Sequence, residues 1–252
     1  MFEQVDLHIH TKYLKCANET MTIPAIIATA EELGLTTIAI TDHLNAPEFL
    51  DDHRPIRDDL AEIETDMNVI FGVEVNVTDP ATGAISIDDY QRDALDFEFI
   101  IGGVHGSYFD EPDPRGIIDL QHSLMLAVVK NPLIDVLVHP WWFAGREFDS
   151  GVMAWMKDMS LLPEEYIAEL GETALENDVA IEANGGAIFA NTRYYTPAFL
   201  EDYAEYLYKL ASYGVEIAIG SDAHDIERLD RCKIAGRAVR DAGITEDQLL
   251  IP

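Results

Sequence analysis

Residues 5–10 read VDLHIH, an apolar run that ends on two histidines. The same arrangement recurs six more times along the chain, each time as a short run rich in Ile and Val that leads into polar residues. The seven runs lie at residues 5–10, 36–43, 69–77, 97–105, 136–139, 179–183 and 215–220. They are mostly continuously apolar rather than alternating, which indicates strands of a parallel sheet buried on both faces.

Helical patterns fill the intervals between these runs. Thr22 and Thr196 each precede a proline and a stretch with apolar residues at helical spacing, and Pro163 with the acids after it opens a third helix. Weaker helical patterns lie at residues 54–66, 117–129 and 234–242. Residues 75–87 resemble a hairpin-like excursion, and residues 141–160 an irregular insertion with three tryptophans. Strand–helix alternation predicts an α/β fold with a single (β/α) barrel domain over residues 1–252, although an open doubly wound sheet has the same alternation.

The charge of the chain is extreme. Sixteen basic and 47 acidic residues give a formal net charge of −31, yet 48% of the 252 residues are hydrophobic, which excludes a disordered acidic protein. The acidity disfavours binding to nucleic acid or to an anionic membrane, and it fits a surface adapted to a salty cytoplasm. Two cysteines make no disulfide framework, no signal peptide is visible, and the apolar runs are too short to span a bilayer. We therefore expect a cytoplasmic protein.

Metal-binding residue types gather where the runs end. Six of the eight histidines lie there, the exceptions being His53 and His122. The polar residues at the seven ends are His8, His10, Asp42, His43, Glu74, His105, His139, Glu182, Asn184, Asp222 and His224. In a barrel the carboxyl ends of the strands meet on one face, so these side chains would share one cleft. The alternation of a strand points His8 and His10 the same way, as a pincer for one metal ion.

A single histidine at a strand end is more often a hydrogen-bonded polar residue than a metal ligand. Six imidazoles gathered with two carboxylates would be costly to bury without cations. Their number exceeds the three or four ligands of one catalytic zinc ion. The pattern therefore predicts two or three divalent metal ions.

Seven blocks carry a resemblance to a known family: DLHIHT, AITDH, GVEVN, IIGGVH, VLVHP, IEAN and IGSDAH. In this order they resemble the polymerase and histidinol phosphatase (PHP) family, and in particular its stand-alone phosphatases. The resemblance covers nearly the whole chain. It implies a distorted seven-stranded, TIM-like (β/α) barrel around two or three metal ions.

The resemblance also implies ligand sets. The first site would use His8, His10, Glu74 and Asp222. The second would use His105 and His139, with Glu74 bridging to the first. The third would use His43, His224 and Cys16, where relatives often have a histidine in place of the cysteine. A thiolate ligand favours zinc over manganese or magnesium at the third site, and for the cluster as a whole manganese or iron remain possible. Alternatively, Cys16 is an ordinary loop thiol and the third site is weak or absent.

The implied activity is hydrolysis of phosphomonoesters of small metabolites, by attack of a metal-activated hydroxide on phosphorus. Histidinol phosphate and nucleotides are candidate substrates, and the oligomeric state is open. Arg193 and Arg146 follow strand ends and are candidate phosphate ligands, or surface ion-pair partners in an acidic protein. Asp42, Asp6 and Glu182 would orient the metal-binding imidazoles. The cluster Trp141-Trp142-Phe143 lines the pocket or packs in the core.

Two other readings stay open. An amidohydrolase-like enzyme that cleaves C–N bonds also begins with His-x-His on a barrel strand, but it usually has a bridging lysine where this chain has His105. A non-catalytic metal-binding domain would have lost ligands, whereas at least eight competent positions remain here.

Overall fold

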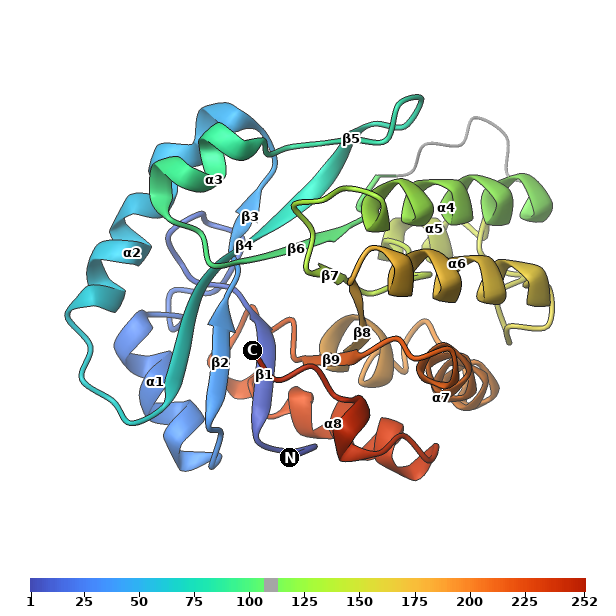
Figure 1. Cartoon of the computed structure of the whole chain (residues 1–252). Coiled ribbons are helices and arrows are strands. Elements are labelled where there is room, and N and C mark those ends of the chain that lie inside the picture. Colours follow the sequence, from blue (N-terminus) through green and yellow to red (C-terminus); the bar gives the residue numbers. More distant parts are fainter. Residues whose placement is uncertain (107–112) are drawn as a thin grey trace.

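Seven parallel strands form the centre of the molecule (Figure 1). The computed structural model describes residues 1–106 and 113–252. In spatial order the strands are β1 (Val5–Ile9), β2 (Thr37–Ile40), β4 (Asn68–Asp79), β6 (Phe99–Gly103), β7 (Val136–Leu137), β8 (Ala180–Asn184) and β9 (Ile217–Gly220). The two-residue strand β3 (His43–Leu44) runs parallel to β4, and β5 (Ala84–Ile85) runs antiparallel to it. Each predicted run overlaps one of the seven strands, and β4 and β8 extend beyond their runs.

The first and last strands approach each other and nearly close the sheet. The amide of Asp222 donates to the carbonyl of His8 at 2.8 Å, and the amide of His10 donates to the carbonyl of Ala223 at 3.2 Å. The sheet is therefore a nearly closed, TIM-like barrel, which confirms the predicted fold class and excludes the open doubly wound alternative.

Two separate groups of apolar side chains show which way each strand faces. The inner group comes from all seven strands, and its members are Val5, Leu7, Ala39, Ile70, Phe99, Ile101, Val136, Val138, Ala180 and Ala218. Leu250 packs against this group next to the start of β9, where its amide donates to the carbonyl of Ile217. The outer group lies between the strands and the helices. Apolar residues thus fill the inside of the barrel, and the polar site lies beyond them at the carboxyl ends of the strands.

Helices surround the barrel (Figure 1). The α-helices are α1 (Ile23–Glu32), α2 (Arg54–Ala61), α3 (Asp89–Leu95), α4 (Pro114–Val129), α5 (Gly145–Asp149), α6 (Glu164–Glu176), α7 (Pro197–Ser212) and α8 (Arg231–Asp241). Short turns of other helix types are η1 (Pro47–His53), η2 (Gly185–Phe189), η3 (Ile226–Arg228) and η4 (Glu246–Gln248). Across the described ranges, every helix is too short or too polar to cross a membrane.

Predicted helix starts agree with the observed caps. The hydroxyl of Thr22 accepts from the amide of Ala25, and that of Thr196 accepts from the amide of Phe199. Each threonine therefore satisfies an amide that the first helical turn leaves without a partner.

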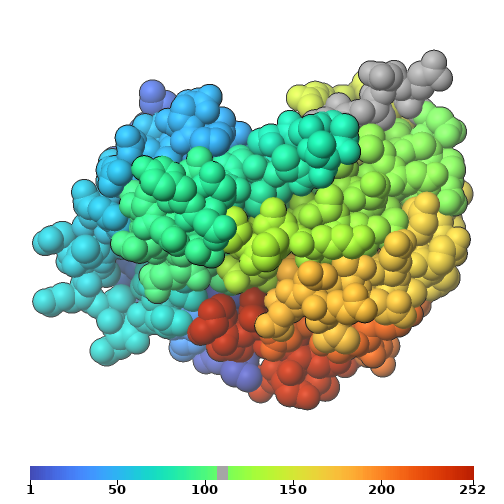
Figure 2. All heavy atoms as spheres, turned by 45° about the horizontal axis from the view of Figure 1, so that its top comes forward, coloured from blue at the N-terminus to red at the C-terminus, as the bar shows by residue number. Residues whose placement is uncertain are grey.

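The excursion over residues 75–87 is the antiparallel pair of β4 and β5, as expected. Gly83 lies at its turn with a φ of +70°, directly against Ala127 of α4. Figure 2 shows this excursion lying over the α4 segment. Residues 141–160 contain the short helix α5 and are otherwise turns, as the irregular sequence indicates.

An irregularity in β1 sets the direction in which His8 and His10 point. Val5 and Leu7 belong to the inner group and Ile9 to the outer group, although strict alternation would place Leu7 and Ile9 on one face. The register of β1 against β2 shifts between Asp6 and Ile9. This shift in register interrupts the alternation, so that the side chains of Leu7 and His8 both point to the inside of the barrel.

Candidate metal centre

The metal-binding residue types converge at the carboxyl end of the barrel. His8 lies in β1, His43 in β3, Glu74 in β4 and Glu182 in β8. Residues just past β1, β6, β7 and β9 supply His10, His105, His139, Asp222 and His224. The structure therefore brings all six predicted histidines and both predicted carboxylates together.

Glu74 lies at the centre of the cluster and is 1% exposed. Its Oε1 is 2.8 Å from Nε2 of His105 and 3.1 Å from Nε2 of His139. Its Oε2 is 2.7 Å from Nδ1 of His43, 3.4 Å from Nε2 of His8 and 3.5 Å from Nε2 of His10. One carboxylate thus faces two groups of imidazoles, as a bridging ligand would.

His8 and His10 form the predicted pincer. Their Nε2 atoms are 3.0 Å apart, and Oδ1 of Asp222 lies 3.3 Å from Nε2 of His10. Nδ1 of His8 is 2.8 Å from Oε1 of Glu182. A proton shared with Glu182 leaves the lone pair of His8 Nε2 directed into the cluster. This contact is the one that the predicted orienting role of Glu182 requires.

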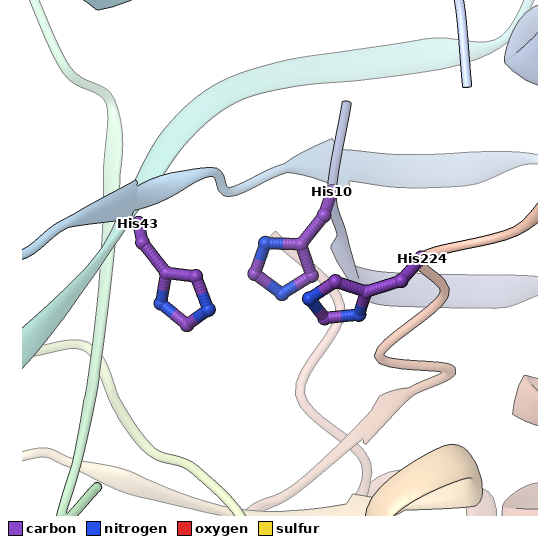
Figure 3. Close-up of side chains that lie close together, drawn as sticks. All are labelled: His10, His43 and His224. Carbon is purple, nitrogen blue, oxygen red and sulfur yellow. The ribbon is translucent and has the colours of Figure 1, made fainter. Parts of the chain in front are cut away.

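Three imidazoles face one another on the second side of the cluster (Figure 3). The ring centroids of His10 and His224 are 4.0 Å apart in a stacked arrangement, and those of His10 and His43 are 4.6 Å apart. The three rings offer nitrogen atoms within 4.8 Å of one another. His43 and His224 therefore lie together as expected, with His10 as their neighbour.

Cys16 lies beside this group, exposed at the site's edge. Its sulfur lies within 4.8 Å of donor atoms of His10 and Asp42. Burial and the Asp42 carboxylate raise the pKa of the Cys16 thiol to about 12. The structure therefore associates Cys16 with His10 and Asp42, whereas the expected set joined it to His43 and His224.

Trp142 packs over the third side of the cluster. Its ring centroid is 5.4 Å from that of His139 and 6.0 Å from that of His105. Trp141 is 1% exposed and belongs to the core. Trp141 thus packs in the core, whereas Trp142 contacts two histidines of the cluster, and a role in lining the pocket stays a prediction.

Burial and charge act against each other on the titrating groups. Burial lowers the pKa of His8, but Glu182 and Glu74 outweigh it and leave that pKa well above its ordinary value. Burial and the neighbouring His43 hold the pKa of His10 well below its ordinary value. Burial raises the pKa of Glu74, but the imidazoles around it bring that pKa well below its ordinary value. The cluster thus keeps Glu74 ionised.

Backbone strain accompanies two of the cluster residues. His139 has a φ of +31° and Asp222 a φ of +53°, in the region that residues with a Cβ rarely adopt. Such conformations cost about 1–3 kcal/mol each and concentrate at functional sites. The fold therefore tolerates strain where these two side chains enter the cluster.

The donor set fits divalent metal ions. The Nε2 atoms of His8 and His10 meet at 3.0 Å while both face the carboxylates of Glu74 and Asp222. Imidazole nitrogens and carboxylate oxygens with converging lone pairs are the ligands of zinc, manganese and iron. A cation between these atoms would satisfy lone pairs that point at one another.

Two of the expected orienting residues act differently. Asp6 accepts from the amides of His8 and Ser221, and Asp42 accepts from the amide of Thr11. Burial raises the pKa of each carboxyl to about 7. These carboxylates accept hydrogen bonds from backbone amides and so hold the loops that carry the histidines.

Asn184 is a site residue for which the sequence analysis assigned no role. Its Nδ2 donates to Glu182 at 3.0 Å and to Asp222 at 3.4 Å. It lies two residues past Glu182 on the same strand, so strand alternation could have placed both on one face. Asn184 links the carboxylate behind His8 to the one beside His10.

The two predicted arginines lie in or against helix α5, within or next to the insertion over residues 141–160. Arg193 is 71% exposed, pairs with Asp149 at 3.2 Å and lies over the ring of Tyr194. Arg146 lies in α5, the helix that contains Asp149. The role of both arginines in phosphate binding stays a prediction.

Comparisons with known proteins agree with this site. The family model described as "PHP domain" matches residues 6–140, which is 135 of the 252 residues. A protein named "Probable phosphatase" from Caldicellulosiruptor saccharolyticus is 26% identical, over 96% of this chain and 88% of that protein. The "DNA polymerase/3'-5' exonuclease PolX" of Bacillus subtilis is 26% identical, over 93% of this chain but 36% of that protein.

A similar fold occurs among solved structures. A chain in a structure of archaeal ribonuclease P with mature tRNA superposes with a TM-score of 0.50 and 16% identity, over 94% of this chain and 87% of that one. At this identity the likeness shows the fold alone. From the match over more than half of its length, and from the barrel and histidine cluster that accompany it, we conclude that this chain belongs to the PHP domain family.

Proposed function

We propose that this protein is a metal-dependent phosphoesterase that hydrolyses phosphomonoesters of small metabolites. The observation that carries the proposal is the position of Glu74, whose two oxygens lie between 2.7 and 3.5 Å from nitrogens of five histidines. A buried carboxylate surrounded in this way is suited to bridge metal ions in one cleft. The relatives named "Probable phosphatase", which match nearly the whole chain, support the same activity.

The family resemblance implies three ligand sets, and part of each set lies close together in the cluster. The first would be His8, His10, Glu74 and Asp222. The second would be His105 and His139 with Glu74. The third would be His43 and His224 with His10 or Cys16 nearby. We propose zinc as the preferred metal, with manganese or iron as alternatives, because imidazole and thiol ligands suit zinc.

Bound divalent ions would lower the pKa of a water molecule and offset negative charge on the phosphoryl oxygens. The chain's own contribution is to hold the ligands in place. Glu182 fixes the orientation of His8, and Asn184 ties Glu182 to Asp222. Trp142 covers the side of the cluster at His105 and His139, where it limits the access of water.

A cavity beside His43 offers space for the leaving group. It has a volume of about 350 Å³, at the lower end for small-molecule sites. Its walls are Tyr13, Leu14, Lys15, Cys16, His43, Asn45, Phe49 and Asp52. The hydroxyl of Tyr13 donates to Asp59, which holds the ring as a fixed wall. Such a cavity suits a small organic group, and the net charge of −31 disfavours a long polyanion.

The decisive test is a substrate panel with the metal-loaded protein. Histidinol phosphate, nucleoside monophosphates and p-nitrophenyl phosphate represent the proposed substrates, and N-acyl amino acids represent an amidohydrolase. We expect release of inorganic phosphate from phosphomonoesters and no cleavage of the amides. Amide cleavage without phosphate release would overturn the proposal in favour of C–N hydrolysis. Tight metal binding without turnover of any phosphoester would favour a binding domain.

A further inference from the structure

Most arginines in this acidic protein have carboxylate partners. Seven of the ten form ion pairs, namely Arg54, Arg57, Arg92, Arg115, Arg193, Arg237 and Arg240. In the part of the chain that the structure describes, Arg228 and Arg231 form no ion pair. Arg228 is exposed, whereas Arg231 is half-buried and its guanidinium has no hydrogen bond to any described residue.

Arg231 is the first residue of α8 and is half-buried. Its Nη1 lies 3.6 Å from the point that a Cβ on Gly186 would occupy, and the carbonyl oxygen of Asp222 lies 3.4 Å from the same point. A Cβ on Gly185 would collide with the Arg231 backbone. The two glycines at the start of η2 therefore let the chain at Arg231 and Ser221 approach closely, and the guanidinium lies beside Gly186, near the backbone of Asp222.

The charges around Arg231 leave it unsatisfied. Burial and the nearby Arg228 lower its pKa, against the attraction of Asp230, Asp222 and Asp225. None of these carboxylates approaches within 4.0 Å of its nitrogens, since no ion pair forms. A guanidinium that is partly desolvated and faces a second cation gains from a bound anion.

We propose that Arg231 binds the anionic oxygens of the substrate's phosphoryl group, from the η2 side of the metal cluster. The inference rests on the proposed phosphoesterase function and adds the substrate-binding cation to it. Arginine suits this role because its planar donors engage two phosphate oxygens at once. Arg193, which the sequence favoured, already has Asp149 as a partner, since its Nη2 donates to both carboxylate oxygens at 3.2 Å.

Calorimetric titration of inorganic phosphate into the metal-loaded protein tests this assignment. Arg231→Gln is the test variant, Arg231→Lys retains the charge without the planar fork, and Arg237→Gln on the same helix is the control. We expect Arg231→Gln to weaken phosphate affinity and to raise KM by about 10- to 100-fold, at unchanged metal content. Arg231→Lys should regain part of the affinity, and Arg237→Gln should match the wild type.

Each other outcome is informative. Phosphate affinity and KM equal to wild type in Arg231→Gln would overturn the role of Arg231 while leaving the phosphoesterase proposal intact. Loss of metal from Arg231→Gln and Arg231→Lys alike would assign the residue to support of the cluster, and so also overturn the proposal. A metal-loaded wild type that neither binds phosphate nor hydrolyses any phosphomonoester would overturn both the role of Arg231 and the proposed phosphoesterase function.

Discussion

At the scale of single residues, Glu74 is the group that connects the histidines of the cluster, since it contacts five of them. It is buried, its pKa lies well below its ordinary value because of the imidazoles around it, and both oxygens face nitrogen donors. The register of β3 against β4 places His43 directly beside it. No other carboxylate among the described residues contacts five histidines.

Replacement of Glu74 by Gln retains the side-chain shape and removes the charge. We expect Glu74→Gln to lose at least one metal ion per chain and to release phosphate more than about 100-fold more slowly, because a ligand should matter more than the residues that orient ligands. Elemental analysis and a phosphate-release assay measure the two effects. Glu169→Gln, at a glutamate that pairs with His122 outside the cluster, is the matched control. Normal metal content and rate in folded Glu74→Gln would refute the bridging role.

Cys16 tests the third metal site. Its sulfur is close to His10 and Asp42, and partial desolvation with the Asp42 carboxylate raises the pKa of the thiol, which stays protonated until a metal displaces the proton. We expect Cys16→Ser to bind about one metal ion fewer per chain by elemental analysis, whereas Cys232→Ser, at the buried cysteine in α8, should bind the full number. An unchanged number in Cys16→Ser would make Cys16 an ordinary loop thiol.

At the scale of elements, the sequence predicted which strand ends carry the site, but not the backbone geometry that orients the side chains there. The seven strands and the ends that carry the histidines followed from apolar runs and the residues after them. The bulge in β1 could not be predicted, because it depends on pairing with β2 and appears in VDLHIH as ordinary alternation. Helix α3 was also missed, since it has one buried residue, Leu95, and a capping box at Asp88 and Gln91 as its main local signal.

The roles of the charged residues were hardest to predict for the same physical reason. Arg193 follows a strand end in sequence, but its partner Asp149 lies 44 residues away. Asp6 and Asp42 lie beside histidines in sequence, yet they accept hydrogen bonds from backbone amides. Such contacts depend on partners that are distant in sequence, and a single sequence does not show which distant residues meet.

Closure of the barrel can be tested at Gly220 in β9. A Cβ there would overlap the carboxylate of Glu182 and lie 2.6 Å from the Cβ of His8. We expect Gly220→Ala to lower metal affinity at least about 10-fold, because Glu182 orients His8, and to cost about 1–3 kcal/mol of stability by overpacking. Metal titration and thermal unfolding measure these effects.

Gly116→Ala is the control for Gly220→Ala. A Cβ at Gly116 meets only an oxygen of Asp113 at 3.6 Å, so its metal affinity should be unchanged. Wild-type metal affinity in Gly220→Ala would contradict the tight contact between β9, Glu182 and His8.

At the scale of the whole molecule, the charge of −31 and the metal site are compatible. Few of the 47 acidic residues contact the cluster, while many lie on exposed positions such as Asp58 and Glu164. Two or three divalent ions would add about four to six positive charges at one face. The site can therefore attract a small anion although the protein as a whole repels polyanions.

The surface charge predicts a salt-dependent stability. Like charges repel one another at low ionic strength, and about 1 M salt shortens the screening length to about 3 Å. We expect the unfolding midpoint of the metal-loaded protein to rise as KCl increases from about 0.05 to about 1 M. Circular dichroism melting curves check this prediction. A midpoint that falls, or stays constant, would show that carboxylate repulsion contributes little to stability.

The central claim is that the histidine cluster holds metal ions that make the protein a phosphomonoesterase. The measurement that tests it most directly is phosphate release from a small phosphomonoester before chelation, after chelation, and during stepwise return of Zn²⁺ or Mn²⁺. We expect release to stop in the metal-free protein and to recover fully at two or three ions per chain. Undiminished release from the metal-free protein, or no release at full metal occupancy, would contradict the claim.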